Sequence, residues 1–267
     1  MKKYFQIFKI SFQQEFSYRL NFIMWRVRNI LQIILTFFLW SSVFKNPQTE
    51  VFGYNQEKIL TYVFGILILR AIVFSARAVD VAGEISNGDI TNFLLKPISY
   101  FKYWATRDIA SKVLNLSFSI FEITILFLIL KPHLFLQVNP LILFTVLVSL
   151  VAAVILFFCL LFITNMSAFW MPENGWAVQF LFIVIITDFF SGGVFPLDIL
   201  PYTFQKILYS TPFPYLLFFP LQVYLGKIAG LEIIRGLVTA FTWVLILFMT
   251  VKFIWAKGLR RYSAEGR

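Results

Sequence analysis

Charged and nucleophilic side chains are scarce in this sequence. Only 13% of the 267 residues are charged, whereas an average soluble domain has about 25%. With one cysteine and one histidine, the chain lacks the residues that build a disulfide framework or a zinc site. It also lacks the GxxxxGK[ST] loop that binds the phosphates of ATP. We therefore expect no catalytic site, no metal site and no ATP-binding site in this chain.

The sequence is rich instead in apolar side chains. Hydrophobic residues make up 60% of the chain, with 34 phenylalanines, and the mean hydropathy is +0.81. A water-soluble protein of this composition would expose large apolar patches and aggregate. We predict one all-α polytopic membrane domain over residues 1–267. Six apolar segments are each long enough to cross a hydrocarbon core of about 30 Å: about 22–44, 59–79, 113–131, 140–164, 177–195 and 234–256.

The basic residues predict how these segments are oriented. A formal net charge of +10 would suggest nucleic acid as a partner of a soluble protein. In a membrane protein, Lys and Arg gather instead at the cytoplasmic ends of the spans. Sixteen of the 23 Lys and Arg residues lie on the side of the two termini, six lie on the other side, and Arg70 lies within a span. We therefore expect a multi-pass protein of the cell membrane with both termini in the cytoplasm and no nucleic-acid partner.

The segment 1–21 predicts an amphipathic helix at the membrane interface. Phe5, Phe8, Phe12 and Phe16 recur at helical spacing, and polar residues such as Lys9 fall on the opposite arc. Such a helix either anchors the first span on the lipid surface or docks a partner. The sequence leaves both roles open.

Two stretches between the spans do not fit simple loops. The inner one, 80–108, carries apolar residues between turn residues, so lipid headgroups or another protein should cover it. The outer one, 196–228, is apolar but interrupted by prolines, which argue against one unbroken helix. It predicts two short re-entrant helices at an outer gate. The turn residues of this region are Gly192, Gly193, Pro196, Pro201, Pro212 and Pro214.

Three ionisable residues lie near the middle of predicted spans: Arg70, Glu122 and Asp188. An unpaired charge there costs at least about 2.5–3.5 kcal/mol, so we expect Arg70 to pair with Glu122 or with Asp188. Such a pair either fixes the register of two helices or forms a polar element of a translocation path or its gate. Arg26 and Arg28 lie near the end of a span, and we expect their side chains to extend to the interface.

The order of these features resembles the permease subunits of type-2 ABC exporters, in the compact branch without a fused ATPase. Those permeases have an amphipathic N-terminal helix, six spans, both ends inside and paired re-entrant helices before the last span. After the second span they carry an Arg, then a Glu followed by a Gly and a Leu-rich run that ends in Pro. The residues that match in that order are Arg77, Glu84, Gly88, Leu94, Leu95 and Pro97. The outer region of this chain is also similar to that of the family.

The resemblance implies an ATP-driven exporter for a hydrophobic or amphipathic substrate. A separate ABC ATPase subunit would bind ATP and Mg, and would dock on a coupling helix within 80–108 and on the N-terminal helix. This chain itself would hold no cofactor. A second permease, identical or paralogous, and membrane lipids would complete the assembly. The substitution Glu84→Arg is then expected to uncouple transport while leaving membrane insertion intact.

Three other classes of protein remain open. A secondary transporter half would show interrupted segments at matching positions in both halves, and this chain has them only in the second half. A membrane enzyme acting on lipid-linked substrates would need clustered carboxylates at one interface, whereas those of the inner loop are interleaved with Lys and Arg. A non-transporting membrane scaffold is the third class. The sequence does not identify the substrate.

Overall fold

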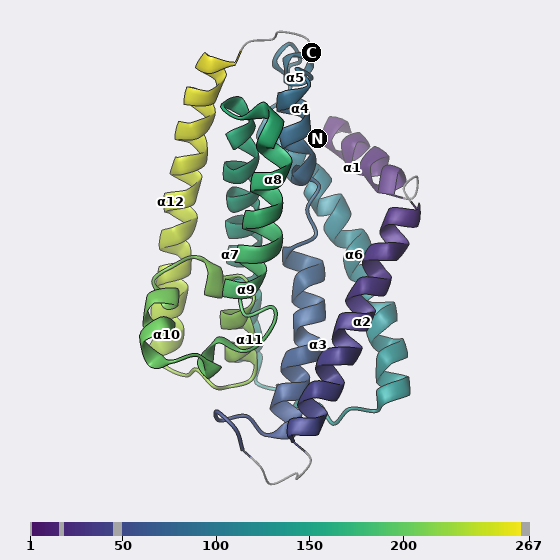
Figure 1. Ribbon diagram of the computed structural model, residues 1–267, viewed down its shortest axis with the longest axis vertical. Coiled ribbons are helices and arrows are strands. Elements are labelled where there is room, and N and C mark those ends of the chain that lie inside the picture. Colours follow the sequence, from purple (N-terminus) through teal and green to yellow (C-terminus); the bar gives the residue numbers. More distant parts are fainter. Residues whose placement is uncertain (1, 16–18, 45–49, 263–267) are drawn as a thin grey trace.

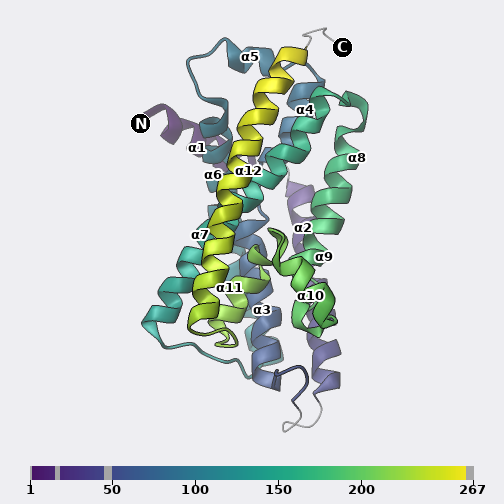
Figure 2. The same cartoon turned by 90° about the vertical axis from the view of Figure 1, so that its left-hand side faces the viewer.

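The computed structural model describes residues 2–15, 19–44 and 50–262, which form an elongated bundle of helices (Figures 1 and 2). These residues contain no β-strand, only an isolated bridge between Val51 and Tyr54. The α-helices are α1 (Lys2–Glu15), α2 (Arg19–Val43), α3 (Gln56–Val73), α4 (Val81–Ser86), α5 (Ile90–Leu94), α6 (Tyr100–Leu130), α7 (Pro140–Asn165), α8 (Gly175–Gln179), α9 (Asp188–Phe190), α10 (Tyr202–Tyr209), α11 (Phe218–Tyr224) and α12 (Leu231–Arg261). The 3₁₀ turns are η2 (Ala78–Asp80), η3 (Met166–Phe169), η4 (Pro172–Asn174), η6 (Leu197–Ile199) and η7 (Phe213–Tyr215), and η5 (Phe180–Thr187) is a π-helix.

Among the described residues, three helical segments are long and apolar enough to cross a membrane: α6, α7 continued by η3, and α12. The pair of α3 with η2 and α4 adds a fourth if it is one broken span, bent by 57°. The stretch Ala177–Phe190 is apolar but shorter. The chain is thus an all-helical, multi-pass membrane protein. A helix overlaps each of the six predicted ranges, while the number of crossings stays a prediction.

Local signals explain where the long helices begin and end. Asn55 and Asn139 are N-caps, because their side chains accept hydrogen bonds from backbone N–H groups in the first turns of α3 and α7. Pro140 occupies the start of α7, where a missing N–H costs no helical hydrogen bond. α6 ends at Lys131, whose φ of 43° is left-handed. The two N-caps begin α3 and α7, and Lys131 ends α6, so the chain can turn between neighbouring helices.

Helix α7 lies at the centre of the packed core. It contacts α3, α11 and α12, and its Ala152, Ala153 and Leu156 are fully buried. Small residues at a helix contact let the two backbones approach closely, which favours helix packing in lipid. α6 and α12 expose apolar side chains along their outer faces, such as Phe121 and Phe253. The bundle therefore has a packed centre and an apolar outside.

Helix α6 is longer than the predicted span 113–131. It begins at Tyr100 and has 31 residues, which at 1.5 Å per residue is about 46 Å, more than the bilayer core requires. Its first turns belong to what the sequence predicted as the inner loop 80–108. The rest of that loop holds two short helices, α4 and α5, where we had expected one coupling helix.

Helices α1, α4 and α5 and the end of α12 lie together at one end of the bundle (Figure 1). Lys3 Nζ donates a hydrogen bond of 3.0 Å to the carbonyl of Pro97, which follows α5. The hydroxyls of Thr91 in α5 and Tyr262 after α12 are 3.3 Å apart. Lys3 of α1 and Tyr262 after α12 therefore both contact the predicted coupling loop.

The predicted interface helix is present as α1, which packs against α6. Ser11 is its buried residue, Phe8 and Phe12 are half-buried, and Phe5 is 71% exposed. Phe16 lies outside the described residues. Part of the phenylalanine stripe thus points away from the bundle.

The outer region 196–228 forms two short helices, α10 and α11, as its prolines predicted. Pro201 directly precedes α10, and Pro212 and Pro214 lie in the turn between the two helices. α11 is buried against α7 and α3, whereas most of α10 is exposed. Whether these helices enter the bilayer stays a prediction.

Candidate functional site

Arg70 of α3 and Asp188 of α9 form an ion pair inside the bundle. Nη2 of Arg70 lies 2.7 Å from Oδ1 of Asp188 and donates a hydrogen bond of 2.8 Å to the carbonyl of Gly193. The two side chains are only 14% and 17% exposed. The structure therefore selects Asp188 from the two partners that the sequence left open for Arg70.

The Gly192–Gly193 turn makes this approach possible. A Cβ on Gly193 would overlap the Asp188 carboxylate and lie 2.8 Å from Nη2 of Arg70. Gly192 has a φ of 82°, which disfavours residues with a side chain, and its carbonyl accepts a hydrogen bond of 2.6 Å from the Tyr62 hydroxyl. Two predicted outer residues thus hold α3 against the end of α9.

The second buried ion pair corrects the interpretation of Arg26. We expected this side chain to extend to the interface, but it is buried and lies 3.1 Å from Glu122 of α6. It also donates hydrogen bonds to Ser119 and Asn115 on the same helix. The expectation was wrong because Arg26 lies on the face of α2 that packs toward α6, where the carboxylate of Glu122 pairs with its charge. Glu122 is therefore no partner of Arg70.

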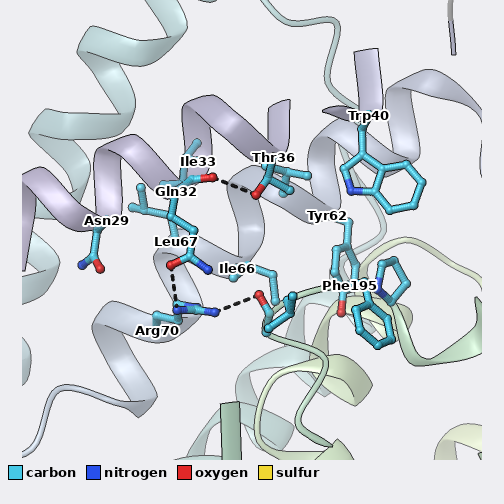
Figure 3. Close-up of a pocket in the computed structure, with 14 residues that line it drawn as sticks. Asn29, Gln32, Ile33, Thr36, Trp40, Tyr62, Ile66, Leu67, Arg70 and Phe195 are labelled. Carbon is cyan, nitrogen blue, oxygen red and sulfur yellow. Dashed lines mark hydrogen bonds between the residues drawn. The ribbon is translucent and has the colours of Figure 1, made fainter. Parts of the chain in front are cut away.

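A hollow lies between α2, α3 and residues 193–196, next to the Arg70–Asp188 pair (Figure 3). Arg70 and Asn29 line its inner end, and Trp40, Tyr62 and Pro196 line its outer end. Asn29 and Trp40 are eleven residues apart on α2, which corresponds to about 16 Å along the helix axis. The hollow therefore follows the long axis of the bundle.

The break between α3 and η2 is bridged by one turn of α6. Nζ of Lys112 donates hydrogen bonds to the carbonyls of Val73 and Ser75, at 3.1 and 2.6 Å. Oδ1 of Asp108 accepts hydrogen bonds from the backbone N–H groups of Arg77 and Ala78, at 2.6 and 2.9 Å. We name Asp108 and Lys112 the α6 clamp. It satisfies backbone groups that the 57° bend leaves without helical partners.

The predicted coupling residues surround this bend and the two short helices after it. Arg77 precedes η2 and pairs with Asp80 at 3.7 Å. Glu84 of α4 accepts a hydrogen bond of 2.7 Å from the Tyr100 hydroxyl. Burial raises the pKa of the Glu84 carboxyl, and this hydrogen bond opposes the shift. Glu84 thus faces α6 from α4.

The remaining coupling residues lie around α5. Gly88 has a φ of 84°, which lets the chain turn sharply between α4 and α5. Leu94 ends α5, and its side chain lies outside the described part of the structure. Leu95 is 83% exposed, and Pro97 is exposed as well. The end of α5 is therefore the part of the loop that an apolar partner surface could reach.

Residues 165–176, to which the sequence assigned no role, pack against α4. Nδ2 of Asn165 donates a hydrogen bond of 3.1 Å to the carbonyl of Ala78, and the Ser86 hydroxyl donates one of 3.0 Å to the carbonyl of Pro172. Gly175 leaves room for Ala82, whose Cβ would lie 3.5 Å from an added Cβ. α4 is thus held between α6 on one side and this segment on the other.

A polar cluster that the sequence did not indicate joins the segment before α3 to the outer region 196–228. The Tyr54 hydroxyl donates to Asp198 at 3.1 Å, Gln222 donates to Tyr54, and Lys227 pairs with Asp198. Nζ of Lys227 also donates to the carbonyl of Phe52 at 3.0 Å. Burial lowers the pKa of Lys227, and the contact with Asp198 opposes this shift. No spacing rule links these residues, since Phe52 and Tyr54 precede α3 and the others are spread over the outer region 196–228.

The described residues contain no group of three or more His, Cys, Asp or Glu side chains that could hold a metal ion. They form a multi-pass membrane protein that keeps charged residues paired inside an apolar helix bundle, as transporters do. The family model of the ABC-2 family transporter protein matches residues 30–266, so the chain belongs to this family. This confirms the resemblance predicted from the sequence. No curated protein shows significant similarity to the chain. Members of the family are generally non-catalytic membrane components that typically work with an ATPase partner.

Proposed function

We propose that this chain is the membrane-spanning subunit of an ATP-driven exporter, with six crossings and both termini in the cytoplasm of the cell. The observation that carries the proposal is the clamped bend between α3 and α4 in a chain of the ABC-2 family. A short helix held on two sides by the bundle moves only together with the helices around it. A force applied to α4 from the cytoplasm is therefore transmitted to α3 and α6.

A separate ABC ATPase subunit docks at the end of the bundle formed by α1, α4 and α5. Leu95 supports this assignment, because it is 83% exposed at the end of α5 and offers a partner an apolar contact there. Lys96 beside it is also exposed, so the surface combines an apolar centre with a basic rim. ATP and Mg bind to that subunit.

The exported substrate passes along the hollow beside the Arg70–Asp188 pair. Charges inside the membrane are expensive, so an ion pair whose arginine lines a hollow supports a functional role beyond helix register. A second permease, identical or paralogous, forms the other wall of the path. The substrate is hydrophobic or amphipathic, since apolar side chains dominate the lining.

The test is ATPase stimulation by the purified chain in nanodiscs, together with candidate ABC ATPase subunits, beginning with one encoded beside it. We expect the chain to bind one of them and to raise its ATPase rate. Leu95→Asp should abolish this binding, whereas Leu136→Asp should not, because Leu136 is 75% exposed in the loop at the opposite end of the bundle. Binding that survives Leu95→Asp and fails in Leu136→Asp would overturn the assignment of the docking surface. Stimulation by no ABC ATPase would overturn the proposed function.

A further inference from the structure

The hollow beside Arg70 has polar groups on one side and an apolar surface on the other. Its volume is about 40 Å³, enough for about three water molecules and thus for one small polar group, not for a sugar ring or a polycyclic drug. The polar side chains Asn29, Gln32 and Thr36 come from one face of α2, and Arg70 comes from α3 (Figure 3). The space therefore fits a head group of a few atoms.

Arg70 has donor capacity that the protein does not use. Its Nη2 binds Asp188 and the Gly193 carbonyl, and Nη1 is 3.5 Å from Oε1 of Gln32, the limit of a hydrogen bond. Its Nε is buried and has no hydrogen-bond partner among the described residues. A buried donor without a partner costs about 1–3 kcal/mol. Arg70 lines the hollow, so an acceptor oxygen of a ligand there would bind Nη1, whose contact with Gln32 is long.

The chemistry of this donor favours a ligand with acceptor oxygens. A guanidinium has five N–H donors and no acceptor, so every group it binds must supply an acceptor. Asp188 balances the charge of Arg70, and the positive charge of Arg28, on α2, acts on the same site from farther away. Oxygens of a carboxylate or a phosphate form the strongest hydrogen bonds with such a fork.

An apolar surface continues from the hollow along the outside of α2. Gln32 and Thr36 line both the hollow and this second, open depression, whose other residues are Arg28 and the apolar Met24, Val27, Leu31 and Leu35. Met24, Leu31 and Leu35 are 66%, 54% and 70% exposed. A hydrocarbon chain attached to a head group in the hollow would lie on them. The depression faces outward from the bundle, so such a ligand would reach it from the lipid.

We propose that this site binds a single-chain anionic amphiphile, with its phosphate or carboxylate on Arg70 and its hydrocarbon chain along α2. The inference rests on the proposed function, because it names the substrate class of the same path. Nη1 of Arg70 holds the head group, and Asp188 and the Gly193 carbonyl hold Nη2 of the same guanidinium. Leu31 and Leu35 select for the hydrocarbon chain.

The test measures binding to the purified full chain in nanodiscs of zwitterionic lipid, without any ATPase. The probes are lysophosphatidic acid, oleic acid and lysophosphatidylcholine, each with an oleoyl chain. We expect at least one of the first two to bind about tenfold more tightly than lysophosphatidylcholine, whose head group is neutral overall. The difference between lysophosphatidic acid and oleic acid then shows whether phosphate or carboxylate is preferred.

Two variants locate the site. Arg70→Lys keeps a positive charge beside Asp188 but removes the Nη1 donor, and Thr36→Trp fills the hollow without changing Arg70. Each should weaken binding of the preferred anion by about tenfold. Thr124→Trp is the matched control, because Thr124 is exposed on α6 away from the hollow, and it should bind as the unchanged chain does.

Equal binding of all three probes would overturn the inference, and so would unchanged affinity in Thr36→Trp. If Arg70→Lys does not fold, Thr36→Trp alone decides, since it leaves the ion pair in place. Because no ATPase is present, failure here is separate from failure of the proposed function. A chain that stimulates an ATPase but binds the three probes equally remains an exporter subunit with another substrate class.

Discussion

Asp108 and Lys112 lie one turn apart on α6 and hold opposite sides of the break between α3 and η2. The carboxylate of Asp108 accepts hydrogen bonds from N–H groups at the start of η2. The ammonium of Lys112 donates hydrogen bonds to carbonyls at and just after the end of α3. Each charge thus meets the helix end whose dipole it complements. α6 braces the bend from the side, so the angle between α3 and α4 depends on the position of α6.

This arrangement predicts the effect of removing the carboxylate. Asp108→Ala leaves the N–H groups of Arg77 and Ala78 without their acceptor and should lower the free energy of unfolding by about 2–3 kcal/mol. Asp108→Asn keeps one acceptor oxygen and should cost less than half as much. Thermal unfolding of the purified variants measures both values. If the alanine and asparagine variants melt at the same temperature as the unchanged chain, the carboxylate does not brace the bend.

A second prediction concerns the glycine beside the Arg70–Asp188 pair. Gly193→Ala places a Cβ against both charged groups, so the pair must separate and Gly193 must move away from α3. We expect a loss of about 2–4 kcal/mol in stability, because two buried charges lose part of their pairing. Gly83→Ala is the matched control: a Cβ there meets nothing within 4 Å, and alanine favours a helix. A melting temperature of Gly193→Ala equal to that of Gly83→Ala would contradict this account.

The positions of the helices followed from hydropathy, but their lengths did not. Hydropathy detects only the part of a helix that lies in the hydrocarbon core, so it predicted 113–131. The first turns of α6, from Tyr100, are more polar and belong to the same helix, but hydropathy does not detect them. The predicted span 59–79 contains α3, which ends at Val73 because the chain bends there and the α6 clamp holds the bend. Whether residues 74–79 belong to the same crossing stays a prediction.

The pairing of buried charges required information that one sequence does not contain. Arg26 lies near the end of an apolar run, and this position predicts an interfacial side chain. Its actual partner depends on which face of α2 turns toward α6, and that rotation is set by packing across the bundle. Arg70 and Asp188 were recognised because both lie deep in apolar runs, where pairing is required wherever the helices meet. The α6 clamp could have been suspected from the sequence, because Asp108 and Lys112 are four residues apart and therefore lie on one face of a helix.

The Arg26–Glu122 pair predicts strong non-additivity between two substitutions. Glu122→Leu alone leaves the guanidinium buried without its carboxylate and should cost about 3–5 kcal/mol. Arg26→Met combined with Glu122→Leu removes both charges and should cost much less than Glu122→Leu alone. Denaturant or thermal unfolding of the single and double variants measures the coupling. A double variant that is less stable than either single variant would contradict this prediction, because it would show that the two charges do not stabilise each other.

Labelling of introduced cysteines tests the predicted orientation. The native Cys159 is buried, and Cys159→Ala provides a background without thiols. In that background we expect Leu136→Cys to react with a membrane-impermeant maleimide on intact cells and Lys96→Cys to react only after permeabilisation, because both positions are exposed at opposite ends of the bundle. The reverse pattern would show that α4 and α5 face outside.

The last prediction concerns Glu84, whose carboxylate receives the Tyr100 hydroxyl. In Glu84→Arg the side chain cannot accept this hydrogen bond, and it places a second positive charge near Arg107. α4 should then move away from α6, and stimulation of the ATPase should fall by about tenfold, which corresponds to about 1.4 kcal/mol. Glu84→Gln keeps an acceptor for Tyr100 and should retain most of the stimulation. Both variants should insert into the membrane at normal yield, because α4 lies outside the long apolar helices. Normal transport by Glu84→Arg, with the ATPase co-purifying as before, would show that the contact between α4 and α6 does not carry the coupling.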